Sequence, residues 1–206
     1  MVESEGRIRL NPDVQKIVCS VTGKAYDPQG FSKPIGLCSC CPAPGKPLVV
    51  VYKLEEIKER LEKQGWGKGP GIWRYGALLP VLGMPWRYAP DVGLTRAVRH
   101  EALGGMNGVD LYLKNEGTNP SGSFKDNGMS AAFTHARTIG AKRAACASTG
   151  NTSASLAMYC SVTRSMRGIN FIGSGKISYG KLSQALDYGA LTVQIAGDFD
   201  DAMVRV

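Results

Sequence analysis

The sequence predicts an α/β fold built on a parallel β-sheet, preceded by a small segment that contains cysteines. Two observations carry this prediction. From about residue 110 onward, short apolar runs alternate with stretches of helical periodicity, and turn residues separate them. This alternation is typical of right-handed βαβ units. Before residue 54, four of the six cysteines lie among prolines and glycines, which indicates a separate, loop-rich segment.

The composition describes a globular chain with an excess of positive charge. The 206 residues suffice for one sizeable domain with a small appendage, hydrophobic content is 43%, and the net charge is +8. Basic residues form no run and do not interleave with aromatic ones, so we expect small anionic ligands and no nucleic acid. The chain has no apolar run of the ~18 residues that a membrane helix needs, and no signal peptide is recognisable. Cysteines without an export signal indicate the reducing cytoplasm.

Residues 1–53 form the first expected unit, which resembles a zinc ribbon that has lost a ligand and ends in a strand at 48–52. Cys38 and Cys41 have the spacing of a zinc knuckle, but Thr22 stands where the partner of Cys19 would be. Cys40 would complete the set only with unusual geometry. The sequence therefore predicts no tightly bound zinc, and leaves Cys19, Cys38 and Cys41 as the candidate metal ligands.

Residues 54–109 are expected to hold a helix, a linker and the lead-in to the core. Apolar positions spaced as on one helix face predict a helix over 54–64, with Gly65 at its C-terminal cap. A glycine-rich linker follows at 65–71. The aromatic residues beyond it are interpreted as packing residues.

Residues 110–206 are expected to form the α/β part. Strands are predicted at 111–114, 143–148, 168–173 and 191–196, and helices at 124–139, 152–162, 177–188 and from about 199. Ligands bind at the carboxyl ends of strands in such sheets. Since Lys125 and the segment 148–152 both follow strand ends, we expect both on the same rim of one sheet.

Lys125 lies in the stretch Gly122-Ser-Phe-Lys-Asp-Asn-Gly-Met129, at a strand-to-helix junction. The start of a helix attracts anions and disfavours cations, so a lysine here is unusual as helix chemistry. An amine beside an anion site can form a Schiff base with an aldehyde that carries a phosphate. The plain alternative is a solvated lysine near a helix start.

This stretch resembles the lysine motif of the fold-type II pyridoxal-phosphate enzymes, the tryptophan synthase beta-like superfamily. With Cys146-Ala-Ser-Thr-Gly-Asn-Thr-Ser-Ala-Ser155 downstream, the chain is similar to the N-terminal portion of threonine synthases, from about residue 72 onward. The resemblance implies that Lys125 is catalytic and binds pyridoxal 5′-phosphate, and that Asn151 contacts the cofactor ring. It also implies a substrate-binding set, which is Ser148, Thr149, Asn151, Thr152 and Lys176. For Lys176 the alternative of a surface lysine stays open, and Arg96 stands where the family has a proline after Thr95.

The implied reaction converts O-phosphohomoserine and water to threonine and phosphate. The glycine-rich Gly-Asn-x-Gly-Asn loop that binds the cofactor phosphate in the family does not occur in this sequence. We therefore expect a truncated fold that is inactive alone and acts with a complementary C-terminal half or as a homo-oligomer. Two alternatives stay open. One is a fragment of a threonine or serine dehydratase, although those usually have histidine where Thr152 stands. The other is a non-enzymatic remnant or interaction module that uses the cysteine segment.

Overall fold

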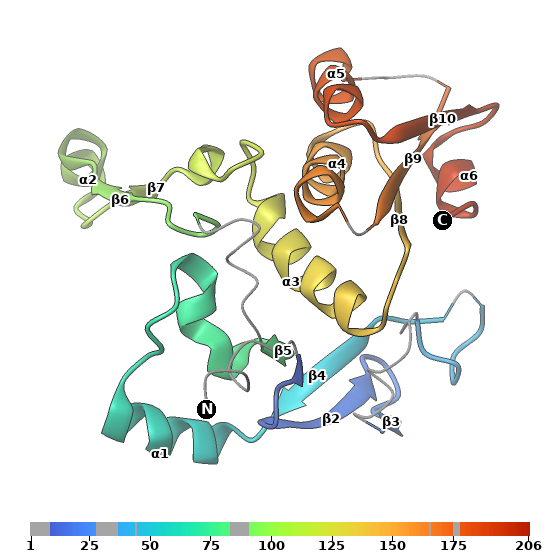
Figure 1. Ribbon diagram of the computed structural model, residues 1–206. Coiled ribbons are helices and arrows are strands. Elements are labelled where there is room, and N and C mark those ends of the chain that lie inside the picture. Colours follow the sequence, from blue (N-terminus) through green and yellow to red (C-terminus); the bar gives the residue numbers. More distant parts are fainter. Residues whose placement is uncertain (1–8, 28–36, 44, 83–90, 165, 175–177) are drawn as a thin grey trace. The chain divides into compact units, whose positions relative to one another are not determined.

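The computed structural model describes residues 9–27, 37–43, 45–82, 91–164, 166–174 and 178–206 (Figure 1). The chain divides into two compact units. The first comprises residues 1–69, 73–87 and 131–141, and the second comprises residues 70–72, 88–130 and 142–206. Among the described helices, none combines the length and the apolar character that a bilayer crossing requires.

The first unit is built on a three-stranded antiparallel sheet with the order β3-β2-β4. Its strands are β2 (Val14–Cys19), β3 (Ala25–Tyr26) and β4 (Leu48–Tyr52). The strand expected at 48–52 is confirmed. Cys19, at the end of β2, lies opposite Leu48, at the start of β4. The turns that flank these two strands therefore lie at one end of the sheet.

Helix α1 (Leu54–Gln64) follows β4 and confirms the helix expected there. Its Arg60 forms two hydrogen bonds with the Asp13 carboxylate, at 3.1 and 2.5 Å. A short antiparallel pair joins β1 (Arg9–Leu10) to β5 (Val81–Leu82). Between them along the chain lies the 3₁₀ segment η2 (Gly71–Leu78), and the buried Asn11 side chain donates to three carbonyl groups at residues 76, 77 and 79.

The second unit contains the expected parallel sheet, with three strands in the order β10-β9-β8. These are β8 (Arg143–Ala147), β9 (Arg167–Gly173) and β10 (Leu191–Ile195). Helices α4 (Asn151–Thr163) and α5 (Tyr179–Asp187) lie on one side of the sheet, and α6 (Phe199–Met203) lies on the other (Figure 1). The α/β fold class predicted from the alternation is confirmed.

Helix α4 is buried on every side over residues 153–160 because it packs against both the sheet and α5. Small side chains make this close approach feasible. Ala157, Ala185 and Ala190 form a buried cluster, and a Cβ on Gly168 of β9 would lie 3.1 Å from the Cys160 sulfur. A helix that is buried all round carries no single apolar stripe.

One element of the predicted sheet is wrong. Within the described chain, β7 (Tyr112–Lys114) pairs antiparallel with β6 (Ala97–Arg99) in a separate two-stranded sheet. Helix α2 (Glu101–Asn107) connects them. A strand of only three residues does not reveal which strand it will pair with. Here β7 pairs with β6, which is close in sequence and joined to it by the short helix α2. Lys125 therefore does not follow a strand of the parallel sheet, and the expectation that it shares one sheet rim with 148–152 is wrong.

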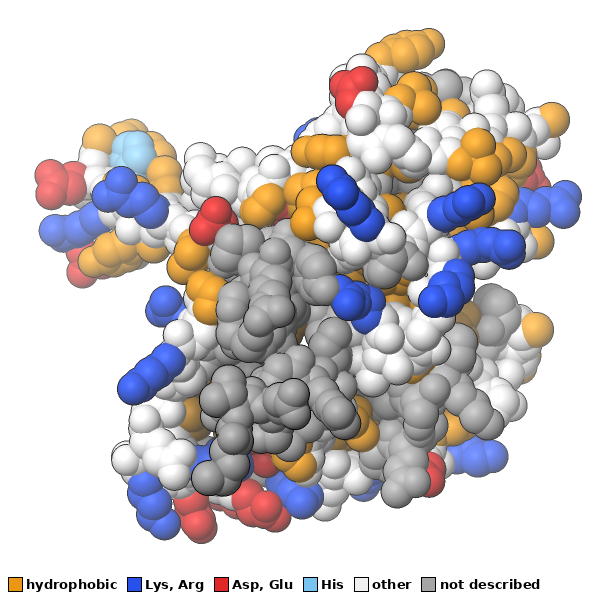
Figure 2. Space-filling model, in the orientation of Figure 1, with side chains coloured by type: hydrophobic (Ala, Val, Ile, Leu, Met, Phe, Trp, Pro, Cys, Tyr) orange, Lys and Arg blue, Asp and Glu red, His pale blue; other side chains and the backbone are white. Residues whose placement is uncertain are grey.

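The surface carries both basic and exposed apolar side chains. Figure 2 shows Lys and Arg side chains distributed over separate elements of the visible face. The β6–α2–β7 segment exposes apolar side chains, among them Val98, Met106 and Tyr112. Helix α3 (Lys125–Thr138) follows this segment after the 3₁₀ turn η4 (Glu116–Thr118), in agreement with the helix expected at 124–139.

Candidate functional site

Lys125 is the first residue of α3 and is half-buried. Its N–H donates to the hydroxyl of the buried Ser123 at 3.2 Å, so this side chain satisfies one of the free donors at the start of the helix. Gly122 just before it has φ +79°, a conformation that favours glycine. The Lys125 ammonium lies 4.7 Å from the centroid of the Phe124 ring. This cation–π contact holds the amine next to the turn.

The residue after the lysine, Asp126, is completely buried. Its carboxylate accepts hydrogen bonds from the Ser121 N–H at 2.7 Å, the Ser121 hydroxyl at 2.6 Å and the Ser155 hydroxyl at 2.5 Å. Ser155 belongs to α4. A buried carboxylate with three donors is satisfied without a metal ion or a basic residue. The lysine turn is thus joined to the helix that begins at Asn151.

Two further contacts hold the same turn. The Tyr159 hydroxyl of α4 donates to the Asp126 carbonyl at 3.4 Å, and the Gln184 amide of α5 donates to the Ser121 carbonyl at 3.0 Å. The sequence alone did not predict this network around Asp126. A signal was present, since Ser153 and Ser155 are hydroxyl residues among the mostly apolar residues at the centre of this helix.

The segment 148–152 links β8 to α4. The Ser148 N–H donates to the Phe171 carbonyl at 3.2 Å, and the Ser148 hydroxyl accepts the Gly150 N–H at 3.1 Å. Gly150 caps α4 without a side-chain hydrogen bond, and the first turn of α4 has no acidic residue. A helix start of this kind is suited to an anion.

A cavity of ≈ 230 Å³ lies at the carboxyl ends of the three parallel strands. Ser148 and Thr149 line it just after β8, residues 171–174 line it from the end of β9 and just beyond, and Asp198 and Phe199 line it from the start of α6. The structure thus brings Ser148 and Thr149 into one cavity. Lys125, Asn151 and Thr152 are not among its lining residues, and Lys176 lies outside the described residues.

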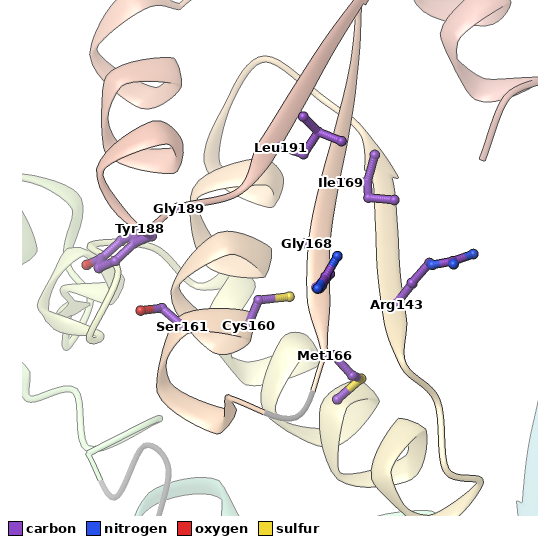
Figure 3. Close-up of a pocket in the computed structure, with 10 residues that line it drawn as sticks. Arg143, Cys160, Ser161, Met166, Gly168, Ile169, Tyr188, Gly189 and Leu191 are labelled. Carbon is purple, nitrogen blue, oxygen red and sulfur yellow. The ribbon is translucent and has the colours of Figure 1, made fainter.

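A larger cavity of ≈ 480 Å³ lies at the opposite end of the same strands (Figure 3). Arg143 and Leu191 line it from the first residues of β8 and β10, and Cys160 lines it from α4. None of the candidate residues named from the sequence lines this cavity. Its size therefore does not identify it as the site.

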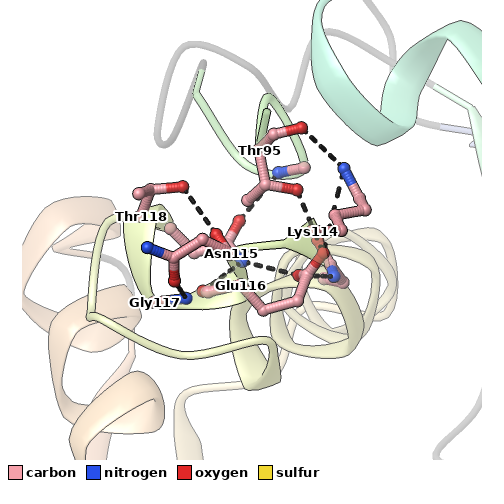
Figure 4. Close-up of polar contacts among 9 residues, drawn as sticks. Thr95, Lys114, Asn115, Glu116, Gly117 and Thr118 are labelled. Atoms are coloured by element: carbon pink, nitrogen blue, oxygen red, sulfur yellow. Dashed lines mark hydrogen bonds and ion pairs between the residues drawn. The ribbon is translucent and has the colours of Figure 1, made fainter. Parts of the chain in front are cut away.

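Glu116 organises the loop before α3 (Figure 4). Its carboxylate accepts hydrogen bonds from the Thr95 hydroxyl at 3.0 Å, the Asn119 amide at 2.9 Å and the Asn127 amide at 3.1 Å. Lys114 adds an ion pair at 3.9 Å. Burial by itself raises the pKa of Glu116, but these donors and the lysine outweigh it, so the pKa is lowered from its ordinary value.

The same network fixes the turn around Thr95, where the sequence has Arg96 in place of the expected proline. The Gly93 N–H donates to the Asn119 side chain at 2.9 Å, and Thr95 is 8% exposed with its hydroxyl on Glu116. Side-chain hydrogen bonds, and not a proline ring, therefore hold this turn.

In the first unit, the four cysteines of the N-terminal segment lie together. The sulfurs of Cys19, Cys38, Cys40 and Cys41 are all within 4.8 Å of one another. Hydrogen bonds from the side chain and N–H of Thr22 and from the Val21 N–H lower the pKa of Cys19 to about 5. The neighbouring Cys38 thiol, together with burial, raises the pKa of Cys41 to about 12. The three candidate ligands named from the sequence are brought together, and Cys40 joins them.

Comparisons with known proteins agree with the motifs. A family model described as pyridoxal-phosphate dependent enzyme matches residues 88–206. The chain is 41% identical over 190 residues to a threonine synthase of Methanocaldococcus jannaschii, which covers 91% of this chain and 45% of that protein. A threonine synthase of Methanosarcina acetivorans is 41% identical over 160 residues, which covers 77% of this chain and 38% of that protein. The chain thus spans less than half the length of these curated relatives.

Among solved structures, the processed form of threonine deaminase isoform 2 from Solanum lycopersicum aligns with a TM-score of 0.52. It covers 68% of this chain and 41% of that chain at 19% identity. At this identity the likeness is one of fold alone.

Proposed function

Because the chain belongs to the pyridoxal-phosphate dependent enzyme family, we propose that it is the lysine-bearing part of a threonine synthase. Such an enzyme converts O-phosphohomoserine and water to threonine and phosphate. The observation that carries the proposal is the junction of two motifs. The turn that presents Lys125 is bonded through Asp126 and Ser155 to the helix that starts at Asn151. The 41% identity to a threonine synthase over 91% of the chain supports this choice of enzyme.

The residues present fit pyridoxal 5′-phosphate. Lys125 is half-buried beside a turn in which the exposed Gly122 has a positive φ, and a Cβ at position 122 would meet no atom closer than 3.8 Å, so the backbone of this turn is open to an approaching ring. We assign the attachment of the cofactor aldehyde to the Lys125 amine, and contact with the cofactor ring to Asn151. When bound, the cofactor supplies a conjugated ring that stores an electron pair during proton removal.

The chain's own groups would do the remaining work. We assign the α-carboxylate of the substrate to Ser148, Thr149, Asn151 and Thr152. The first turn of α4 favours negative charge there because no side chain caps it and no acidic residue lies in it. The Lys125 amine then moves protons at Cα and Cβ of the substrate, while phosphate leaves from Cγ and water adds at Cβ. Lys176 is assigned to the substrate phosphate.

A second candidate is a threonine or serine dehydratase, which the fold of the deaminase relative allows. Thr152 argues against this function, because dehydratases usually have histidine at that position. Since the chain spans less than half the length of its curated relatives, we propose that a complementary C-terminal part brings the loop for the cofactor phosphate. The chain alone would then be inactive, and the assembled enzyme would act on a small amino acid in the cytoplasm.

The test combines the purified chain with the C-terminal remainder of the Methanocaldococcus jannaschii relative and pyridoxal phosphate. Borohydride reduction and peptide mapping should place the label on the peptide that contains Lys125. The Lys125→Arg variant should lose the label, and the matched Lys142→Arg variant should keep it. Label on Lys114, Lys142 or Lys176 would overturn the assignment. Release of phosphate from O-phosphohomoserine, lost in Lys125→Ala, distinguishes a threonine synthase from a dehydratase, for which serine or threonine would be the substrate.

A further inference from the structure

We propose that Cys19, Cys38, Cys40 and Cys41 bind one zinc ion as four thiolates. The sulfurs of Cys19 and Cys38 lie 3.5 Å apart, those of Cys19 and Cys41 lie 3.7 Å apart, and no pair in the set exceeds 4.8 Å. A tetrahedron with zinc–sulfur bonds of about 2.3 Å has edges of about 3.8 Å. The four sulfurs are therefore spaced as a zinc ion requires, with small adjustments.

The fourth ligand comes from a residue adjacent to the third. In the sequence, Thr22 interrupts the first ligand pair, which was the reason to expect no tight zinc. The structure places the Cys40 sulfur 3.1 Å from the Thr22 hydroxyl, so Cys40 occupies the position that the residue at 22 would have filled. With Cys40 in the set, the count of thiolates is restored and Thr22 is left as a hydrogen-bond donor to a ligand.

Backbone donors support the sulfurs from outside. The N–H groups of Val21 and Thr22 both approach the Cys19 sulfur at 3.5 Å, and the Lys46 N–H approaches the Cys38 sulfur at 3.3 Å. Such donors orient metal-bound thiolates and offset their negative charge. They come from the two turns that carry the cysteines, one after β2 and one before β4.

The conformation of the turn before β4 depends on Gly45. Gly45 has φ +90°, and a Cβ at this position would overlap the Cys38 carbonyl oxygen. The Cys38 N–H donates to the Lys46 carbonyl at 2.8 Å, and the Gly45 N–H donates to the Pro42 carbonyl at 2.8 Å. The turn therefore brings the Lys46 N–H to the Cys38 sulfur while the cysteines face the other turn.

Disulfide bonding accounts less well for the same cluster. All the cysteines of the chain are free, and the sulfur distances of 3.5 and 3.7 Å exceed the ~2.05 Å of a disulfide bond. Four thiols crowded without a cation would also repel one another on ionisation. Binding of Zn²⁺ displaces four protons and leaves a closed four-sulfur shell with no position for water, which indicates a structural role. The ion would join the two turns that flank the ends of β2 and β4.

The test uses the purified 206-residue chain, prepared under reducing conditions. Metal analysis should give one zinc per chain. Replacement with Co²⁺ should give the visible bands of a tetrahedral site with strong sulfur-to-metal charge transfer. Absence of bound metal after refolding with excess zinc would overturn the proposal, as would intact-mass evidence that the four thiols have paired as disulfides.

Variants identify the ligands. Cys40→Ser should weaken zinc binding in chelator competition by more than about 100-fold, which exceeds the loss typical of an outer-shell residue. The matched Cys146→Ser variant, outside the cluster, should keep the wild-type affinity. If Cys40→Ser retains that affinity, Cys40 is not a ligand and the four-thiolate site is wrong. Should Cys40→Ser fail to fold, the cobalt spectrum of the wild-type chain still separates four sulfur ligands from three. These readouts are independent of pyridoxal phosphate and of Lys125.

Discussion

The Ser155 hydroxyl donates a hydrogen bond of 2.5 Å to the carboxylate of Asp126, and both residues are completely buried. This bond connects α4 to the first turn of α3, 29 positions earlier in the chain. It ties the residue after Lys125 to the helix that begins at Asn151. Two segments with candidate chemistry are thereby held in fixed relation without belonging to one sheet rim.

Removing this donor should destabilise the chain measurably. In Ser155→Ala the buried carboxylate loses one of three donors, and a hydrogen bond to a charged group is worth about 1.5–3 kcal/mol. The control is Ser153→Ala on the same helix, equally buried, whose hydroxyl donates only to the neutral Gly150 carbonyl. Urea unfolding should show a larger loss for Ser155→Ala than for Ser153→Ala. Equal losses in the two variants would mean that the hydrogen bond from Ser155 to the Asp126 carboxylate stabilises the fold no more than one to a neutral carbonyl.

Asp126→Asn tests the same network from the other side. An amide keeps the shape but presents N–H groups where three donors converge, so at least one donor is left unpaired in a buried position. We expect a loss of more than about 2 kcal/mol in unfolding free energy. In the reconstituted enzyme, formation of the Lys125 adduct should fall as well. A stable variant with normal labelling of Lys125 would show that the network does not position the lysine.

The Glu116 network predicts a pH dependence. A carboxyl whose pKa is lowered in the folded state stabilises the fold above its ordinary value of 4.5, and this contribution is lost as the pH falls through the lowered value. Glu116→Gln should therefore lose stability at neutral pH and show a flatter decline as the pH falls below 4.5. The control is Glu101→Gln, whose side chain is 84% exposed. Denaturant unfolding across this range checks both variants, and parallel curves for wild type and Glu116→Gln would contradict the prediction.

Local periodicity predicted most of the elements but not their partners. Helix α1 and strand β4 lie where they were predicted. Strands β8, β9 and β10 form the expected parallel sheet, with the expected helices between them. The pairing of β7 with β6 could not be read, since a three-residue strand is compatible with either sheet. Ser148 and Thr149 line a cavity, while their role in substrate binding stays a prediction. The burial of Asp126 and the position of Cys40 depend on contacts across 29 and 18 residues, which no local pattern encodes.

Gly71 offers a test of the turn that precedes the core. It has φ +52°, and a Cβ there would overlap the Val92 carbonyl oxygen, which accepts the Ile72 N–H. Gly71→Ala combines backbone strain with a clash against backbone, so we expect a loss of at least about 2 kcal/mol. Gly105→Ala in α2 is the control, because a Cβ there meets nothing within 4 Å and helix interiors favour alanine by about 0.5–1 kcal/mol. Thermal unfolding should shift in opposite directions for the two variants.

The chain alone should make no threonine from O-phosphohomoserine, although it carries Lys125 and the segment 148–152. Catalysis with a cofactor requires the reacting atoms to be held within fractions of an ångström, and the lysine by itself fixes only one end of the cofactor. The proposed C-terminal part supplies the loop that binds the cofactor phosphate. Coupled detection of phosphate and threonine should show turnover only when that part is added, with Lys125→Ala inactive in both conditions. Turnover by the purified chain alone that disappears in Lys125→Ala would show that this chain already contains a complete site.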